Sequence, residues 1–178
     1  EQTARLKFIN AGPIGTAELA LTEAKNEICH FAQICHNGLD YIRSAVHATD
    51  EDKFEFYRKK LVKYEEIADR IEYEIATFLN ALPEENISED ARQQVKAMYK
   101  IIGELESLGD AGESISRILS RRNIHNKKFT DKQVEKVDTM LSLVSKAYEV
   151  MISNLQNNEN GQAELRRAVD CEIESNDM

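Results

Sequence analysis

Apolar side chains recur every three or four residues through most of this chain, and that spacing constrains its fold more than any other feature. One series follows intervals of four, three, four, three and four residues: Val137, Leu141, Val144, Tyr148, Met151 and Leu155. Such spacing places all of these side chains on one face of an α-helix. Only two prolines and seven glycines interrupt the 178 residues, and no stretch alternates like a β-strand. The sequence therefore predicts an all-α fold.

Polar capping residues divide the chain into five predicted helical segments. The capping signals, in chain order, are Thr16, Thr49-Asp50-Glu51-Asp52, Ser88 and Thr130-Asp131-Lys132-Gln133. The second helix is expected to run to about Leu82, where Pro83 ends it. Residues 162–178 form the fifth segment. The sequence predicts antiparallel helices joined by short connections.

The domain organisation follows from these segments. We expect residues 1–15 to be a lead-in from a preceding segment, because the chain begins at Glu1 and not at a methionine. We expect residues 16–122 to form an antiparallel three-helix bundle and residues 123–178 to form two further helices. The first helix is expected to turn Leu19 inward. The inward face expected for the third helix comprises Val95, Met98, Ile101, Leu105, Leu108, Gly112, Ile115 and Leu119.

Charge and cysteine content exclude several classes of partner. The formal net charge of −9 argues against a nucleic-acid backbone or an anionic lipid surface as the direct partner. No apolar run is long enough to span a membrane, so we expect no direct membrane insertion of this chain. Cys29, Cys35 and Cys171 make an odd number without metal-finger spacing, which predicts buried thiols in a reducing compartment.

Acidic residues form two matching groups. Glu65, Asp69 and Glu72 are spaced at i, i+4 and i+7, and the same spacing relates Glu106, Asp110 and Glu113. Residues at this spacing lie on one stripe of a helix. If neighbouring helices bring the two stripes together, the carboxylates form the oxygen-rich cluster that hard or borderline divalent cations require.

Spacing alone does not establish such a site. With 32 acidic residues in 178, random placement gives roughly five or six acidic i,i+4 pairs, so a solvated helix face is the alternative. On a helical wheel, the first group lies roughly 110° from the core stripe of its helix and the second roughly 120–140°. The acids are therefore predicted on the bundle surface and not in its interior.

Two glycines accompany the second acidic group. Gly109 and Gly112 stand in the middle of a long predicted helix, where each costs roughly 1 kcal/mol relative to alanine. Gly112 falls on the core stripe, where helix–helix packing explains it. Gly109 lies nearer the acids and predicts a close approach of backbone, side chain or ligand beside them.

The spacing of the histidines does not indicate a catalytic or metal-binding site. His36 and Asp40 are spaced to form an i,i+4 hydrogen bond on the surface of the first helix. His30, His47 and His125 stand alone and are expected to be solvated or capping. No phosphate-binding glycine loop, nucleophile elbow or zinc-protease motif is found. We therefore do not expect an enzyme.

The acidic stretches resemble motifs of the PhoU family. Residues 104–115, Glu-Leu-Glu-Ser-Leu-Gly-Asp-Ala-Gly-Glu-Ser-Ile, resemble the third-helix signature Glu-Leu-Glu-Arg-Ile-Gly-Asp, with Ser107 in place of its Arg. Residues 65–75 are similar to the second-helix pattern of an acid, three residues, Asp, one residue, Leu and Glu. Residues 12–21 look like the junction in bacterial Na⁺/phosphate cotransporter-related proteins, where a PhoU-like domain follows the membrane portion.

The resemblance implies a PhoU-like regulatory domain involved in the control of phosphate uptake. It implies two three-helix repeats, of which the second, residues 123–178, is incomplete and has two helices. It implies iron or zinc, with manganese as a further candidate, bound on the bundle surface. The implied ligands are Glu65, Asp69, Glu106 and Asp110, with Glu72 and Glu113 secondary. It also implies a position on the cytoplasmic side of the bacterial inner membrane. The implied partners are the transporter membrane domain of the same polypeptide and further copies of this chain in a homo-oligomer.

Two other functions are consistent with the sequence. The chain could be a metal-free helical adaptor whose acidic stripe docks a basic protein partner. It could also be a di-metal carboxylate enzyme, but that chemistry usually needs Glu-x-x-His pairs inside a bundle, and both acidic groups are predicted to face outward. The metal-binding regulatory domain is the leading interpretation.

Overall fold

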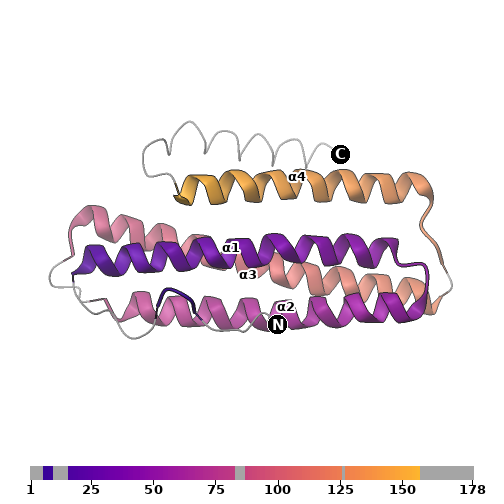
Figure 1. Ribbon diagram of the computed structural model, residues 1–178, viewed down its shortest axis with the longest axis horizontal. Coiled ribbons are helices and arrows are strands. Elements are labelled where there is room, and N and C mark those ends of the chain that lie inside the picture. Colours follow the sequence, from indigo (N-terminus) through magenta and orange to yellow (C-terminus); the bar gives the residue numbers. More distant parts are fainter. Residues whose placement is uncertain (1–5, 10–15, 83–86, 126, 157–178) are drawn as a thin grey trace.

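The computed structural model describes residues 6–9, 16–82, 87–125 and 127–156. Within these ranges all regular secondary structure is helical (Figure 1). The helices are α1 (Ala17–His47), α2 (Glu51–Asn80), α3 (Glu89–Ile124) and α4 (Asp131–Gln156). The prediction of an all-α fold is confirmed for this part of the chain. The predicted fifth segment, 162–178, lies outside the described residues, as does most of the lead-in 1–15.

Each helix begins at a predicted capping residue. The side chains of the first three caps accept hydrogen bonds from the backbone N–H three residues on, as is usual for N-caps. These bonds are Leu19 N to Thr16 Oγ1 at 3.3 Å, Lys53 N to Asp50 Oδ1 at 2.8 Å and Ala91 N to Ser88 Oγ at 3.2 Å. At the start of α4, Thr130 and Gln133 form the reciprocal capping box, with Gln133 N donating to Thr130 Oγ1 and Thr130 N to Gln133 Oε1. The end of α2 at Asn80 comes two residues before the predicted Leu82.

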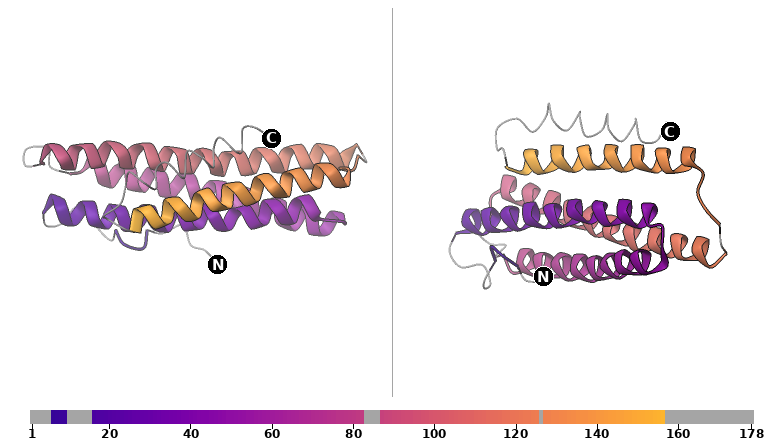
Figure 2. Two further views of the ribbon diagram at one scale, coloured as in Figure 1. Left: turned by 90° about the horizontal axis from the view of Figure 1, so that it is seen from above. Right: turned by 45° about the vertical axis from the view of Figure 1, so that its right-hand side comes forward.

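The first three helices pack pairwise as an antiparallel bundle, and α4 lies against α1 (Figure 2). The largest fully buried apolar side chains come from all three helices of the bundle: Ile28, Phe31, Phe54, Ile71, Ile75, Ile102, Leu105 and Leu119. Burial of this apolar surface is the main force that holds the long helices side by side. Helices α1, α2 and α3 thus supply the packed core beneath their surface residues.

Two of the predicted inward positions are wrong. Leu108 is 42% exposed and Leu19 is 50% exposed. On α3 the buried stripe includes Ile102 and Ser116 instead, because α1 and α2 contact that side of α3. Ser116 is tolerated there because its hydroxyl donates to the backbone oxygen of Glu113 at 2.7 Å.

Polar contacts accompany the packing of α4 on α1. His36 Nε2 lies 2.7 Å from Ser145 Oγ, and Arg43 donates to Ser142 Oγ at 3.2 Å. The predicted surface pairing of His36 with Asp40 is therefore wrong, because the docking of α4 gives His36 a partner from another helix. Leu141 and Tyr148 are the buried apolar residues of α4.

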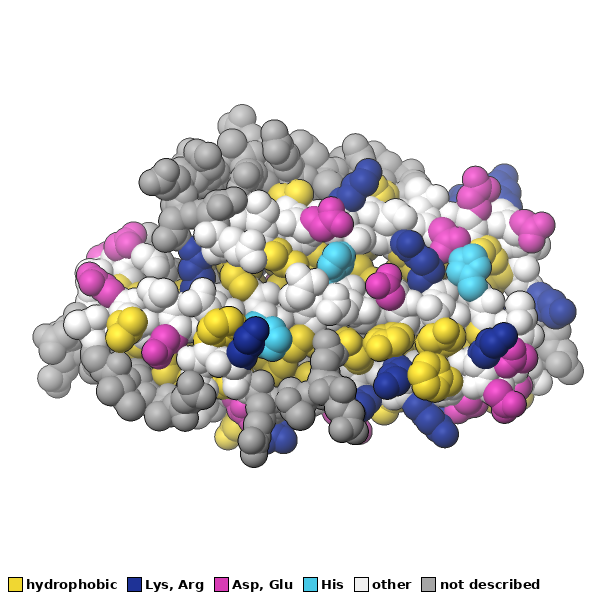
Figure 3. All heavy atoms as spheres, viewed as in Figure 1, with side chains coloured by type: hydrophobic (Ala, Val, Ile, Leu, Met, Phe, Trp, Pro, Cys, Tyr) yellow, Lys and Arg dark blue, Asp and Glu magenta, His cyan; other side chains and the backbone are white. Residues whose placement is uncertain are grey.

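The surface carries mixed charges. On the face shown in Figure 3, acidic, basic and hydrophobic side chains are interspersed over the helices, without a broad region of one charge among the coloured residues. The overall negative charge of the chain is therefore not presented as a uniform field on this face. None of the described helices is long and apolar enough to cross a lipid bilayer.

Candidate metal centre between α2 and α3

A close approach of two helices creates the candidate site. A Cβ built on Gly109 of α3 would lie 3.0 Å from the Cβ of Ala68 and 4.0 Å from the Cα of Glu65, both on α2. Glycine lets the backbones come this near because it has no side chain. The prediction of a close approach beside the acids is confirmed, and the approaching group is the neighbouring helix.

Three predicted residues converge at this contact. One carboxylate oxygen from each of Glu65, Asp69 and Asp110 lies within 4.8 Å of the other two. Glu65 is half-buried, whereas the two aspartates are exposed. Oxygens bound to one zinc ion at about 2.1 Å lie about 3.4 Å apart in tetrahedral geometry. A modest side-chain movement would therefore bring this triad, which draws on both helices, to a coordinating distance.

The other three predicted residues surround the triad. The pKa of Glu106 is raised by desolvation and then by the charges of Asp110, Glu72 and Asp69, with an opposing hydrogen bond from Ser107. Glu72 and Glu106 therefore lie near the triad without joining its closest oxygens. Glu113 forms an ion pair with Arg117, with Nε and Oε2 2.8 Å apart.

Neighbouring carboxylates contribute to the raised pKa values of Glu65 and Glu106. The pKa of Glu65 is raised first by desolvation and then by the charges of Asp69, Asp110, Glu113 and Glu66. The charges of Asp69 and Asp110 thus raise the pKa of both Glu65 and Glu106. In the part of the chain that the structure describes, no ion pair with Lys or Arg reaches Glu65, Asp69 or Asp110. The cluster therefore carries uncompensated negative charge, which would attract a cation.

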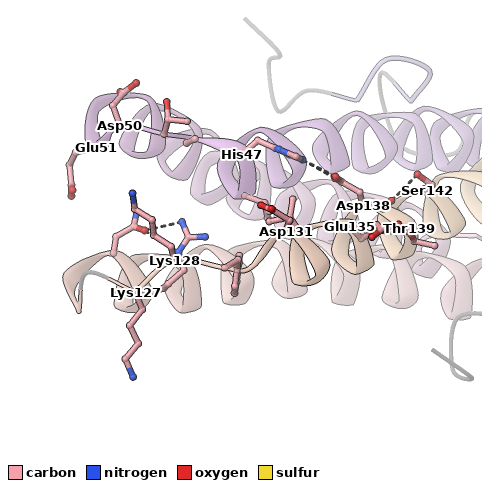
Figure 4. Close-up of a pocket in the computed structure, with 17 residues that line it drawn as sticks. His47, Asp50, Glu51, Lys127, Lys128, Asp131, Glu135, Asp138, Thr139 and Ser142 are labelled. Carbon is pink, nitrogen blue, oxygen red and sulfur yellow. Dashed lines mark hydrogen bonds and ion pairs between the residues drawn. The ribbon is translucent and has the colours of Figure 1, made fainter.

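A separate cleft of the described structure lies away from these acids. It encloses about 1010 Å³ where the α1–α2 connection faces the linker between α3 and α4 (Figure 4), and none of the six acids lines it. Contacts between its lining residues join α4 and the preceding linker to the bundle. His47 Nε2 lies 2.9 Å from Asp138 Oδ2, and the guanidinium of Arg122 stacks 4.6 Å from the centre of the Phe129 ring. We therefore assign this cleft a structural role in joining α4 to the bundle.

Sequence reasoning overlooked two arrangements. The pairing of His47 with Asp138 joins residues 91 apart in the chain, and no local pattern signals it. Glu27 and His30 have the Glu-x-x-His spacing of di-metal enzymes, which was available from the sequence. In the structure, however, Glu27 binds backbone amides of the lead-in and His30 contacts the ring of Phe8. These contacts do not support a di-metal centre inside the bundle.

Comparison with protein-family models, with curated proteins and with solved structures found no match to this chain.

Proposed function

We propose that this chain is a regulatory helical domain that binds a metal cation on its surface between α2 and α3. The observation that carries the proposal is the convergence of Glu65, Asp69 and Asp110, whose oxygens lie within 4.8 Å of one another. Carboxylates are ligands for zinc, iron and manganese. The exposed position of the two aspartates leaves the site open to metal from solution.

A bound cation would offset the repulsion within the cluster. Desolvation and like charges both raise the pKa of Glu65 and of Glu106, so the ionised forms are disfavoured when the site is empty of positive charge. A cation favours the ionised forms instead. Glu65, Asp69 and Asp110 would hold the cation, and Glu106, whose pKa is also raised by the two aspartates, lies close by.

The sequence resemblance connects this site to phosphate transport. Residues 65–75 and 104–115, which resemble the PhoU motifs, are the segments that contribute the converging acids. The three-helix bundle followed by α4 is consistent with one PhoU-like repeat and the beginning of a second. The proposed role is control of phosphate uptake from the cytoplasmic side of a bacterial membrane, with the membrane domain of a Na⁺-dependent transporter as the partner.

Metal-dependent stabilisation tests the binding proposal. The 178-residue chain, treated with chelator, is titrated with Zn²⁺, Mn²⁺ or Fe³⁺, and bound metal is quantified by elemental analysis. A site with free metal at about 100 times Kd stabilises the fold by about 2.7 kcal/mol. Asp69→Asn and Asp110→Asn should abolish this gain. The matched control is Glu135→Gln, which removes an exposed acid from α4 and should respond like the parent.

The outcomes separate the competing functions. If both aspartate variants gain as much stability as the parent, the metal site is wrong. If no metal binds and the chain instead associates with a basic protein in a salt-sensitive manner, the metal-free adaptor is correct. The transport role needs its own measurement. Asp110→Asn in the complete transporter should change phosphate uptake, and unchanged uptake would remove that role while leaving metal binding in place.

A further inference from the structure

A short segment of the lead-in is fixed to the bundle by one buried carboxylate. Residues 6–9, here called the strap, lie at the bundle surface, where Figure 1 draws them below α1 and in front of α2. The backbone N–H groups of Lys7 and Phe8 both donate to Oε2 of Glu27, at 2.8 and 2.6 Å. Two successive amides thus bind the same oxygen of a side chain that belongs to α1.

Glu27 is an unusual residue for this position. Its exposed fraction is 0%, and glutamate is almost never fully buried unless it is paired. Its second oxygen, Oε1, is buried and has no hydrogen-bond partner within the described ranges. Burial of a carboxylate is costly, and here the compensation comes through one oxygen only. The two amide hydrogen bonds of the strap supply that compensation.

Apolar contacts also hold the strap. Ile9 is 9% exposed and joins the main hydrophobic core, and Leu6 packs against the same core in part. Phe8 is 39% exposed and contacts the ring of His30 edge-on at 6.3 Å. The strap therefore has one buried apolar anchor and one polar anchor. When the strap lifts, water can reach Glu27, so the loss of the amide bonds is partly offset by hydration of the carboxylate.

We propose that the strap is a latch: Glu27 holds residues 6–9 on the bundle, and release of this contact frees residues 6–9 while α1, α2 and α3 stay folded. The attached and released states are close in free energy, because the cost of burying Glu27 opposes the gain from its two hydrogen bonds and from Ile9. The latch fixes the position of residues 6–9 relative to α1. It does not depend on metal binding.

Cleavage by trypsin at the Lys7–Phe8 bond measures release. Proteolysis of an opened segment follows the population of the open form when opening is fast. Glu27→Gln keeps the shape of the side chain but removes its charge and places an amide nitrogen where no acceptor is found. We expect cleavage after Lys7 to accelerate about tenfold, the effect of losing a hydrogen bond to a charged group. Glu149→Gln, an exposed substitution on α4, should leave the rate unchanged.

A second variant changes a residue of the strap and none of α1. Phe8→Pro deletes one of the two donors without altering α1, so it cannot disturb the packing around Glu27 from within the helix. Hydrogen exchange at the amide of Lys7 and of Ile9 should become faster in this variant. The thermal transition of the helices, followed by circular dichroism, should be retained.

Each result bears on the latch directly. Faster cleavage with Glu27→Gln and faster exchange with Phe8→Pro, both with intact helices, support it. If Glu27→Gln unfolds the whole bundle, hydrogen exchange in Phe8→Pro tests the latch instead. Unchanged exchange at Lys7 and Ile9 in Phe8→Pro overturns the proposal, and so does unchanged cleavage in a folded Glu27→Gln. All measurements are made on chelator-treated protein, so they are independent of the metal site.

Discussion

Gly109 and Ala68 are close enough that a Cβ added to Gly109 would lie 3.0 Å from the Cβ of Ala68. This separation is shorter than ordinary van der Waals contact between carbon atoms. The absence of a side chain at Gly109 is therefore what lets α3 approach α2 at this level. The adjacent Asp110 is thereby brought to Glu65 and Asp69.

Alanine at Gly109 should destabilise the protein, whereas alanine at Gly103 should stabilise it. A Cβ on Gly103 would meet nothing within 4 Å, so Gly103→Ala gains about 0.5–1 kcal/mol of helix propensity. Gly109→Ala gains the same propensity but forces α2 and α3 apart, since the Cβ of Ala68 cannot rotate away; overpacking of this kind costs about 1–3 kcal/mol. Urea unfolding compares the two variants. Equal stabilisation by both would show that the helices are not in close contact.

Removal of Asp110 should have opposite effects without and with metal. In the metal-free chain, Asp110→Asn relieves repulsion of Glu65 and Glu106 and should stabilise the fold by a few tenths of a kcal/mol, on the order of other like-charge pairs. With metal present, the same variant lacks a ligand and should be less stable than the parent. Thermal unfolding with chelator and with excess Zn²⁺ tests this change of sign. A variant that is equally stabilised in both conditions would indicate an acidic patch without a metal.

Local features of the sequence predicted the helices well. The capping side chains of Thr16, Asp50 and Ser88 interact only with residues three positions away, so their role can be recognised without knowing the rest of the fold. The cost of a glycine in mid-helix is equally local, and it marked Gly109 as a point of close approach. The shared surface patch of 65, 69 and 110 followed from helical geometry together with the expectation that the two helices are neighbours.

The packing of residues that are distant in the sequence could not be predicted from local patterns. Leu108 and Ile102 are both apolar and lie on adjacent parts of α3, and only the direction from which α1 and α2 approach decides that Ile102 is buried. His36 bonds to Ser145, which is 109 residues away, and Glu27 bonds to the lead-in. These partners come from elements whose positions depend on the complete packing of the bundle.

The stability of the metal-free chain should fall as the pH rises through the raised pKa values of Glu65 and Glu106. Both pKa values lie above their ordinary value of 4.5, mainly because of desolvation and then because of the neighbouring acids. A raised folded-state pKa contributes stability below the unfolded pKa, and this contribution is lost as the pH rises through the folded pKa. Glu65→Gln and Glu106→Gln should therefore be more stable than the parent at pH 7 and lose that advantage below about pH 4.

Urea unfolding across this pH range measures the difference between each variant and the parent, with Glu135→Gln as a control that should show no such trend. If Glu65→Gln is less stable than the parent at neutral pH, the carboxylate makes a favourable interaction and the repulsive cluster is wrong.

The reactivity of Cys35 should report the docking of α4. Burial raises the pKa of this thiol to about 12, so little reactive thiolate is present at pH 8. Its Sγ donates to the backbone oxygen of Leu105 at 3.7 Å, and Tyr148 of α4, itself 3% exposed, lines the same small cavity. Tyr148→Ala removes a large buried side chain, at a cost of about 3–5 kcal/mol, and should increase iodoacetamide labelling of Cys35 at least about tenfold, since this cost exceeds 1.4 kcal/mol.

Peptide mass spectrometry distinguishes Cys35 from Cys29, and Met140→Ala, an exposed α4 substitution, is the control. Because α4 packs on α1 from outside the three-helix bundle, the far-ultraviolet circular dichroism of α1, α2 and α3 should persist in Tyr148→Ala. If Cys35 of this variant is labelled as slowly as in the parent, the three-helix bundle alone buries Cys35.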